Sequence, residues 1–375
     1  LEENIHQLKL IFCTDGIFPH IIGGIQRHSR LLIEALGKTG KVNIIAIHPH
    51  TERVFDKGLN IKEITVRGIN TSKNYLLECY RYSKRVYSVL EKYPDYIIYS
   101  QGLSVWYKIK KLGSRLVINP HGLDSYQAPG VWDFLVGLPF RIIFNYLFNY
   151  SAKVVSQGER LTNILKKNIR DISKIAVLAN GVNLPGDYSP LERFGGDSRN
   201  LKVLFIARFA PRKGINILLR AIKELNEEGY ADKITYCLGG AGPLYEYYKS
   251  NFQYKNVSYL GFVSSEQLYK SSDLFVLPTL AEGMPTVVLE AMSYGLPIIV
   301  SNVGATSELV DASNGYLIER NNVAVLKKAI ISFYNLTAEE KNRLSENSYA
   351  KVKKDFTWGY IAGKYIELFR DVENR

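Results

Sequence analysis

Two carboxylates lie on either side of the start of a predicted helix in the stretch TLAEGMPTVVLEAMSYGLPIIVS, residues 279–301. Gly283 lets a ligand approach the backbone closely, and Pro285 suits the first turn of a helix, where the N–H groups have no partner within the helix. These N–H groups and the positive end of the helix dipole suit a phosphate. Glu290 lies about one and a half turns further on, where a carboxylate can accept hydrogen bonds from paired hydroxyls such as those of a ribose. Glu282 precedes the helix, where its carboxylate is expected to point towards the group attached to the phosphate.

Two basic residues could neutralise a diphosphate at this site. Arg208 and Lys213 flank the turn after the first predicted strand of the second half. Arginine and lysine side chains bind phosphate oxygens through charge-assisted hydrogen bonds. Each of these features is common on protein surfaces, and it is their order along the chain that supports a site.

Short apolar runs alternate with helical patterns in both halves of the chain, which is typical of α/β proteins with parallel sheets. Strands are predicted at 8–14, 42–48, 96–102, 115–122, 152–158 and 174–181, and then at 202–209, 233–240, 257–262, 274–278 and 297–301. Helices are predicted at 24–37, 72–93, 214–228, 244–251, 265–271 and 285–294. Two doubly wound domains follow, because 375 residues exceed the ~250–300 at which single cores usually divide.

The stretch 183–200 lacks periodicity and is rich in Gly, Pro, Ser and Asp, so it is interpreted as a linker. In open parallel sheets, ligands bind beyond the carboxyl ends of the strands, and we expect a site in the cleft between two such domains. The other strand-end candidates are Asp15, the glycine pair Gly23-Gly24 before a helix, and the segment NPHGLD with His121 and Asp124.

The composition of the chain limits the classes of protein to which it can belong. The chain is 46% hydrophobic with a mean hydropathy of −0.09, as in soluble globular proteins. Its three cysteines are scattered and predict neither a zinc site nor a disulfide framework, which fits a reducing, cytoplasmic setting. The net charge is +12, and residues 101–170 hold ten Lys or Arg against three acids. This basic region could face nucleic acid, an anionic membrane or phosphorylated small molecules, and a solvated surface is an equal alternative.

The segment PFRIIFNYLFNYSAK, residues 139–153, predicts a helix with one narrow polar stripe and an otherwise apolar circumference. The stripe consists of Arg141, Asn145, Asn149 and Lys153. Asp133, Pro139 and Arg141 interrupt the apolar run that starts at Val131, so the segment is not expected to span a membrane. We interpret it as an internal helix of the first domain, with a helix lying on a membrane surface as the alternative.

The run VLPTLAEGMPTVVLEAMSYGLPIIVSNVGATSELV resembles the diagnostic segment of the family 4 retaining glycosyltransferases of the GT-B fold, whose Glu-x7-Glu motif matches Glu282 and Glu290. The similarity extends over nearly the whole chain. Further similar segments are PHIIGGIQRH, ANGV, FIARFAPRKGINILLRAI, LGGAGPL and VSYLGFVS, and FTWGYIAGKYIELFRDV is similar to the closing helix of the family, which returns to the first domain.

The resemblance implies the α/β GT-B fold, with two doubly wound Rossmann-like domains facing across a cleft. Residues 1–185 and the returning helix 356–375 would form the N-terminal acceptor-side domain, 186–200 the linker, and 201–355 the C-terminal nucleotide-sugar-binding domain. The implied enzyme is a hexosyltransferase that moves a sugar from a UDP- or GDP-sugar to a hydroxyl with retained configuration, in polysaccharide or glycoconjugate assembly.

The resemblance also implies a role for each matched position. Arg208 and Lys213 would hold the donor diphosphate, and the backbone from Gly283 through Met284 and Pro285 to Thr286 its distal phosphate. Glu290 would bind the ribose, Glu282 the donor sugar, Phe262 and Val263 the base, and the Gly24 amide the diphosphate on closure. His121 matches a histidine near the reacting sugar, although a histidine can also simply cap a strand end. Met284 stands where many members have Phe, and the Ala before Arg208 where many have Gly, so Met284 bears on the donor pocket. Asp15 and Asp124 receive no role from the resemblance.

The implied mechanism is front-face departure of the diphosphate, which helps to deprotonate the acceptor, so stabilising that diphosphate is the catalysis. None of the thirteen aspartates forms Asp-x-Asp, and we expect no divalent metal and no cofactor. The expected partners are a nucleotide-sugar and a saccharide or lipid-linked saccharide, in the cytoplasm, with peripheral association at the inner membrane face as an open option and without nucleic acid.

Three rival classes stay open. A GT-B sugar-nucleotide epimerase is the nearest, and it would release free sugar products without an acceptor. A nucleic-acid-binding protein would use the positive charge, but no known binding motif accompanies it. A nicotinamide-dependent oxidoreductase would use the parallel sheets, but GGAG lacks a full GxGxxG.

Overall fold

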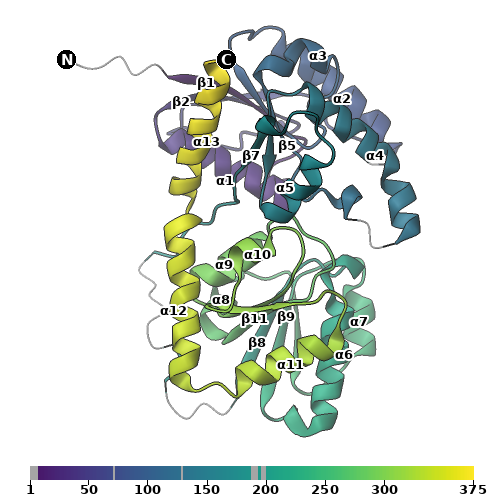
Figure 1. Ribbon diagram of the computed structural model, residues 1–375, viewed down its shortest axis with the longest axis vertical. Coiled ribbons are helices and arrows are strands. Elements are labelled where there is room, and N and C mark those ends of the chain that lie inside the picture. The colour runs from purple at the N-terminus through teal and green to yellow at the C-terminus, as the bar shows by residue number, and fades with distance from the viewer. Residues whose placement is uncertain (1–6, 71, 128–129, 187–192, 196–199) are drawn as a thin grey trace, which may run out of the picture. The chain divides into compact units, whose positions relative to one another are not determined.

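The computed structural model of this protein describes residues 7–70, 72–127, 130–186, 193–195 and 200–375 (Figure 1). The chain forms two compact units, of which the first runs to Gly181 and takes up Trp358–Arg375, while the second is Val182–Thr357. Of the predicted linker 186–200, residues 187–192 and 196–199 lie outside the described residues.

The first unit is a parallel seven-stranded sheet in the order β3-β2-β1-β4-β5-β6-β7. Its strands are β1 Leu8–Cys13, β2 Val42–His48, β3 Ile61–Thr65, β4 Ile97–Gln101, β5 Leu116–Asn119, β6 Lys153–Ser156 and β7 Ile175–Val177. Its helices are α1 Gly24–Lys38, α2 Tyr75–Leu90, α3 Ile109–Leu112, α4 Val131–Tyr150, α5 Glu159–Lys166 and α13 Trp358–Glu373, with short 3-10 turns η1 to η3 at Gly113–Arg115, Asp124–Tyr126 and Ile172–Lys174. The strand order reverses between β1 and β4, which makes the sheet doubly wound.

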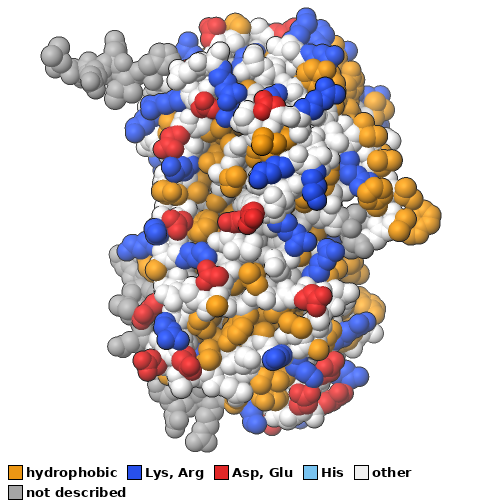
Figure 2. All heavy atoms as spheres, in the orientation of Figure 1, with side chains coloured by type: hydrophobic (Ala, Val, Ile, Leu, Met, Phe, Trp, Pro, Cys, Tyr) orange, Lys and Arg blue, Asp and Glu red, His pale blue; other side chains and the backbone are white. Residues whose placement is uncertain are grey.

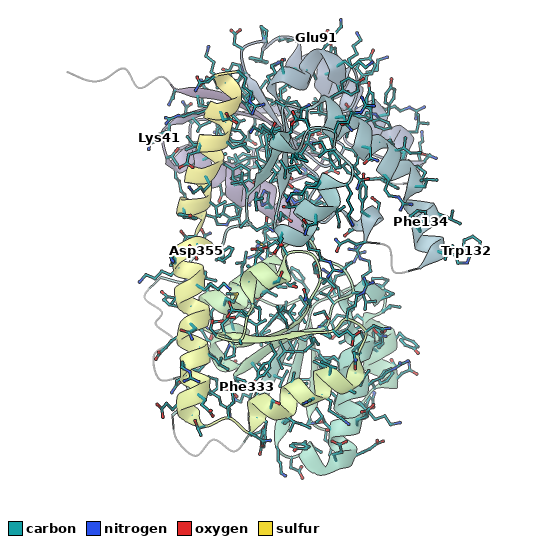
Figure 3. All side chains as sticks on the ribbon, in the orientation of Figure 1. Lys41, Glu91, Trp132, Phe134, Phe333 and Asp355 are labelled. Carbon is teal, nitrogen blue, oxygen red and sulfur yellow. The ribbon has the colours of Figure 1, made fainter. Side chains whose placement is uncertain are left out.

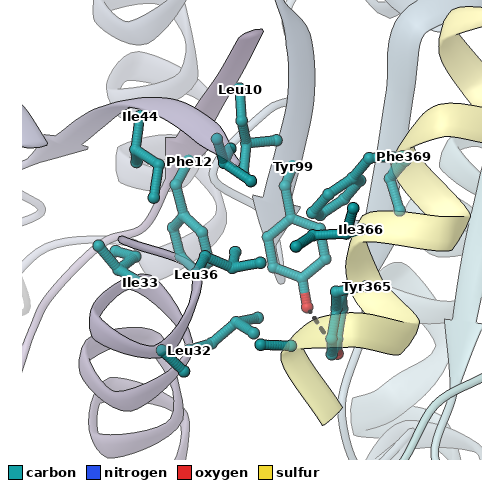
Figure 4. Packing of buried hydrophobic residues seen from close by; sticks show 14 of the residues in the cluster. Leu10, Phe12, Leu32, Ile33, Leu36, Ile44, Tyr99, Tyr365, Ile366 and Phe369 are labelled. Carbon is teal, nitrogen blue, oxygen red and sulfur yellow. Dashed lines mark hydrogen bonds between the residues drawn. The ribbon is translucent and has the colours of Figure 1, made fainter. Parts of the chain in front are cut away.

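The core of the first unit includes side chains from both ends of the chain (Figure 4). Phe12 of β1 packs on Tyr99 of β4 with ring centroids 4.8 Å apart, and both rings are buried. The hydroxyl of Tyr99 donates a hydrogen bond to that of Tyr365 at 3.1 Å. Tyr365 and Phe369 come from α13, so this helix completes the core of the first unit.

The second unit is a parallel six-stranded sheet in the order β10-β9-β8-β11-β12-β13. Its strands are β8 Leu201–Ile206, β9 Ile234–Gly239, β10 Val257–Gly261, β11 Leu274–Leu277, β12 Ile298–Ser301 and β13 Gly315–Ile318. Its helical segments are η4 Pro211–Lys213, α6 Ile215–Leu225, η5 Asn226–Tyr230, α7 Tyr245–Asn251, α8 Glu266–Ser271, α9 Thr286–Ser293, α10 Thr306–Leu309, α11 Val323–Tyr334 and α12 Ala338–Asp355. Here the strand order reverses between β8 and β11, so this sheet is also doubly wound.

The structure corrects the expected helix at 139–153. The helix α4 begins at Val131, continues through Pro139 and ends at Tyr150. Lys153, assigned to the polar stripe, is the first residue of β6, and its Nζ lies 2.7 Å from Asp371 Oδ2. Pro139 has no N–H to donate to the Leu135 carbonyl, and because this part of the helix is exposed, water can bond to that carbonyl instead.

Two strands, β3 and β13, were not predicted, and both lie at the edge of their sheet. The helix expected at 72–93 begins only at Tyr75, because the Asn74 side chain caps it by accepting a hydrogen bond from the Leu77 N–H at 3.1 Å. Among the described residues, the structure contains no helix with the length and apolar character that a membrane span requires.

Candidate functional site

Two loops of the second unit meet at the point where its strand order reverses. One follows β8 and contains η4, and the other follows β11 and leads into α9. The carbonyl of Arg212 accepts hydrogen bonds from the Leu280 N–H at 2.8 Å and from Thr279 Oγ1 at 2.9 Å. In doubly wound sheets, ligands bind at this reversal, beyond the carboxyl ends of the strands.

Gly214 makes the contact between these loops possible. Its φ of 71° lies in the left-handed region, and a Cβ added there would stand 1.8 Å from the carbonyl oxygen of Pro278. Any other residue would therefore force the two loops apart.

The docked loops bring together two of the predicted residues. Lys213 Nζ lies 2.5 Å from Glu282 Oε1, and Thr279 Oγ1 donates to the same carboxylate oxygen at 3.0 Å. Glu282 is buried, whereas the lysine side chain keeps 28% of its surface exposed. The two residues were predicted separately, and their pairing was not foreseen. The pair balances the charge of both groups and holds Lys213 beside the start of α9.

The start of α9 has the features of an anion site. Gly304, with φ 57°, packs so closely that an added Cβ would lie 2.1 Å from the Glu282 carbonyl oxygen, and the Ala305 N–H donates to the Gly283 carbonyl at 2.8 Å. Pro285 is the residue before the helix rather than its first residue, and no side chain caps the helix. Met284 and Pro285 are buried, while Gly283 and Thr286 are partly exposed.

Glu290 is buried on α9, and its carboxylate is oriented by a neighbouring helix. The hydroxyl of Tyr269, on α8, donates to Glu290 Oε2 at 3.1 Å, and the Tyr269 ring stacks on Tyr294 with centroids 5.4 Å apart. The sequence reasoning missed Tyr269, which lies 21 positions before Glu290 and carries no motif of its own.

The ends of β8, β9 and β10 are tied together by the glycine turn after β9. The Phe209 N–H donates to the Ala241 carbonyl at 3.0 Å, and the Gly240 N–H donates to the Gly261 carbonyl at 2.7 Å. A Cβ added at Gly240, where φ is 127°, would lie 1.9 Å from the Ala207 carbonyl oxygen. The glycine run therefore has a packing role among three strand ends.

Arg208, Phe262 and Val263 project from these strand ends. Arg208 is exposed beside the turn that leads to Lys213. Phe262 and Val263 directly follow β10, and both side chains are exposed although they are large and apolar. Exposed apolar side chains at the carboxyl end of a parallel sheet are suited to contact a planar ring.

Gly24 and His121 belong to the first unit. Gly24 is the exposed first residue of α1, whose start no side chain caps. A Cβ added to Gly24 would meet nothing within 4 Å, so no neighbour in the described residues demands glycine there. The space on the Cβ side of Gly24 is therefore open.

His121 is buried just after β5, with a φ of 58°. Its backbone N–H donates to Asn119 Oδ1 at 2.9 Å, and its imidazole ring is hydrogen-bonded to the Gln101 side chain at the end of β4. Burial, with a further contribution from His28, holds the pKa of His121 well below its ordinary value. The imidazole is therefore neutral near pH 7 and can serve as a hydrogen-bonding group.

His28 is a neighbour of His121 that the sequence reasoning missed. The two rings meet edge to face with centroids 5.1 Å apart, and His28 also contacts Trp358 at 5.5 Å. Burial lowers the pKa of His28 to about 4, against the opposing effect of Asn180. His28 could have been recognised in the sequence because it lies four residues after Gly24, on the same face of the predicted helix.

The two aspartates without a role lie in different surroundings. Burial raises the pKa of Asp15, against hydrogen bonds to its own backbone and to Gln26. Asp124 is exposed at the start of η2. Within the part of the chain that the structure describes, no three His, Cys, Asp or Glu side chains are grouped so as to hold a metal ion.

Comparison with known families matches both halves of the chain. Residues 192–351 match the model described as glycosyl transferases group 1, and residues 22–185 match the model described as glycosyltransferase family 4.

Individual proteins are similar to the chain over most of its length. An uncharacterized glycosyltransferase of Methanocaldococcus jannaschii is 27% identical over 361 residues, covering 92% of this chain and 93% of the relative. The UDP-Gal:alpha-D-GlcNAc-diphosphoundecaprenol alpha-1,3-galactosyltransferase of Escherichia coli is 30% identical over 255 residues, covering 62% and 64%. The structure of a sucrose-phosphate synthase from Thermosynechococcus elongatus has a TM-score of 0.81 at 19% identity, covering 98% and 99%, and shares the fold.

Proposed function

We propose that this chain, which belongs to the group 1 glycosyltransferases of the GT-B fold, transfers a hexose from a UDP-sugar to a saccharide hydroxyl with retention of the anomeric configuration. The observation that carries the proposal is the pairing of Lys213 with Glu282 beside the uncapped start of α9. Glu290 lies on α9 itself, eight residues after Glu282.

The donor diphosphate would compete with Glu282 for Lys213. In the structure the Lys213 ammonium lies 2.5 Å from the Glu282 carboxylate. A diphosphate offers more negative charge and more acceptor oxygens, so Lys213 would turn towards it, with Arg208 as a second cation and the α9 amides from Gly283 to Thr286 as donors. The released Glu282 carboxylate would then accept hydrogen bonds from the donor sugar.

The nucleoside would be held by the remaining residues of the second unit. Glu290, oriented by Tyr269, would accept hydrogen bonds from the ribose hydroxyls. Phe262 and Val263 would contact the base. A uracil base is favoured because the Escherichia coli relative is named for a UDP-galactose donor.

In the proposed reaction the anomeric C–O bond to the diphosphate breaks, and the acceptor oxygen forms its bond on the same face of the sugar. The acceptor proton passes to an oxygen of the departing diphosphate, so UDP is the co-product. Cationic and amide groups that stabilise the diphosphate lower the barrier. Gly24 would offer its amide to the diphosphate, and neutral His121 would hydrogen-bond the reacting sugar. We propose that this needs no divalent metal.

The acceptor is proposed to be a lipid-linked saccharide, as in the name of the same relative. A reaction that consumes the donor and releases free sugar without an acceptor would instead favour an epimerase.

Thermal-shift titration with UDP, GDP, ADP and NADH tests the donor site. UDP at 100 times its dissociation constant should stabilise the protein by ~2.7 kcal/mol. Glu290→Gln should lose most of this effect, whereas Glu227→Gln, at an exposed position of the same unit, should keep it. EDTA should leave the UDP shift unchanged. The transferase proposal fails if no nucleoside diphosphate stabilises the protein, or if only NADH does.

A further inference from the structure

The helix α4 carries large apolar side chains that are exposed to solvent, most of them in its first turns. The most exposed are Val131 at 75%, Trp132 at 80%, Val136 at 72% and Ile142 at 63%. Figure 3 labels Trp132 and Phe134 at the projecting end of this helix, where both point away from the first unit. Side chains of this size are normally buried, so a run of them on one element marks an interaction surface.

These residues continue as a stripe along the whole helix. The stripe, called here the α4 apolar face, consists of Val131, Leu135, Leu138, Ile142, Tyr146 and Tyr150, which recur every three or four residues and are all exposed. Tyr75 and Leu77 at the start of α2 are exposed as well, and the Tyr75 ring lies 6.2 Å from that of Phe140, on another side of α4.

The last turns of α4 are attached to the first unit. Asn145 Oδ1 accepts a hydrogen bond from the Tyr126 hydroxyl at 2.6 Å, and Asn149 Oδ1 accepts one from the Arg170 backbone N–H at 2.9 Å. Leu147 and Phe148 are buried in the core. These contacts hold the end of α4 to the first unit, while the apolar side chains of its first turns stay exposed.

Positive charge borders the α4 apolar face. Lys110 Nζ lies 5.0 Å from the Tyr150 ring centroid, and the Arg141 guanidinium lies 3.5 Å from that of Phe134. Lys108 and Lys111 are exposed beside them. Figure 2 shows hydrophobic side chains gathered over the projecting end of α4, with lysine and arginine side chains nearby.

We propose that the α4 apolar face docks on an anionic lipid bilayer, with the first turns of α4 in the boundary between headgroups and acyl chains. A protein groove would accept one side of a helix. Here Val131, Trp132, Phe134, Leu135 and Val136 are exposed at nearly successive positions, and so cover more than half of the helix circumference. Lipid can surround such an end, Trp and Tyr suit the interface, and the basic residues would meet lipid phosphates. Docking of this face on a bilayer does not rest on the proposed transferase function.

Vesicle co-sedimentation of the whole chain tests this proposal. We expect binding to 3:1 POPC/POPG vesicles at low salt and about tenfold weaker partitioning to POPC alone or at high salt. Trp132→Ser/Phe134→Ser should lower partitioning by about tenfold or more. Tyr247→Ser, at a similarly exposed aromatic in the second unit, should leave it unchanged.

Tryptophan fluorescence adds a direct readout. The chain has three tryptophans, of which Trp358 is buried and Trp106 is half-buried, so a blue shift on vesicle addition would report on Trp132. The UDP thermal shift of the double variant should match wild type, which separates a docking failure from a failure of the proposed function.

Three results would overturn the proposal. One is no sedimentation with anionic vesicles at low salt. Another is equal binding of the double variant and wild type. The third is a dimer in solution that the double variant abolishes without any vesicle binding, because the face would then be covered by a second copy of this chain.

Discussion

Two buried histidines distinguish the first unit at the residue scale. His28 and His121 come from α1 and from the loop after β5, and their rings touch in a place where neither is readily charged. Protonating either ring would place a cation beside the other, among Trp358 and Tyr365. Burial keeps His121 neutral, and His28, which has no direct role in the proposed chemistry, adds to this effect.

The stability of the protein should fall in mild acid because of His28. Histidine titrates near pH 6.5 in an unfolded chain, whereas folded His28 stays neutral down to about pH 4. Between these values only the unfolded chain binds the proton, so the free energy of unfolding decreases as pH falls, by about 2 kcal/mol at pH 5 from this residue.

Urea unfolding at pH 7 and pH 5 measures this effect. His28→Gln should show a loss between the two pH values about 2 kcal/mol smaller than wild type. Gln267→Asn, at an exposed position without a titratable side chain, is the control and should lose as much stability as wild type. An unchanged pH dependence in His28→Gln would contradict the assignment.

At the scale of elements, the candidate donor site depends on the contact between two strand-end loops. The Arg212 carbonyl holds the loops together by accepting hydrogen bonds from the Leu280 N–H and the Thr279 hydroxyl, and Gly214 allows their approach. The Lys213 and Glu282 side chains, 69 positions apart, meet only because of this contact.

Gly214→Ala should therefore act on the site as well as on stability. The left-handed φ alone costs about 1–2 kcal/mol for a residue with a Cβ, and the overlap with the Pro278 carbonyl should add about 1–3 kcal/mol. Gly229→Ala is a matched control, because its φ is 85° but its added Cβ meets nothing within 4 Å.

Urea unfolding and the UDP thermal shift measure both effects. Gly229→Ala should show the backbone cost only and keep the UDP shift, while Gly214→Ala should lose more stability and most of the shift. Equal losses in the two variants would mean that the loop contact is unimportant.

Most of the helices and strands could be predicted from the sequence. The edge strands of the two sheets, and the side of α4 that faces the solvent, could not. The interior strands are continuous apolar runs, which are easy to recognise. The edge strands β3 and β13 were missed, since Ile61–Thr65 contains two adjacent charged residues and Gly315–Ile318 is only four residues long. The periodicity of α4 was visible, but periodicity cannot tell whether an apolar stripe faces the core or the solvent.

The site was predicted as a set of positions but not as a set of contacts. Strand-end location identified Lys213, Glu282 and Glu290 one at a time. The partners that orient them, such as Tyr269 on α8, lie on other elements and become neighbours only through the sheet order. No local pattern could supply that information. Their roles in binding stay predictions until the titrations are made.

At the scale of the whole molecule, the first unit is discontinuous in sequence. The second unit, Val182–Thr357, is inserted between the body of the first unit and α13. Tyr365 of α13 is fully buried against Tyr99, whereas Tyr360 on the same helix is 46% exposed.

Tyr365→Ala should destabilise the first unit by about 3–5 kcal/mol, because it removes a buried ring and its hydrogen bond to Tyr99. Tyr360→Ala should change stability by only about 0.5 kcal/mol. Calorimetry with and without UDP assigns the effect. If the two units unfold separately, Tyr365→Ala should lower the melting temperature of the transition that UDP does not raise. A single shared transition would show instead that the units unfold together.

The position of α13 also sets an order of events during synthesis. The ribosome completes every residue of the second unit before it reaches Trp358, so that unit can fold while the nascent chain is still growing. The first unit emerges earlier but must wait, with the hydrophobic surface around Tyr99 uncovered, until α13 arrives. The interval in which this core is uncovered is thus the stage of biogenesis at which a chaperone would be needed most.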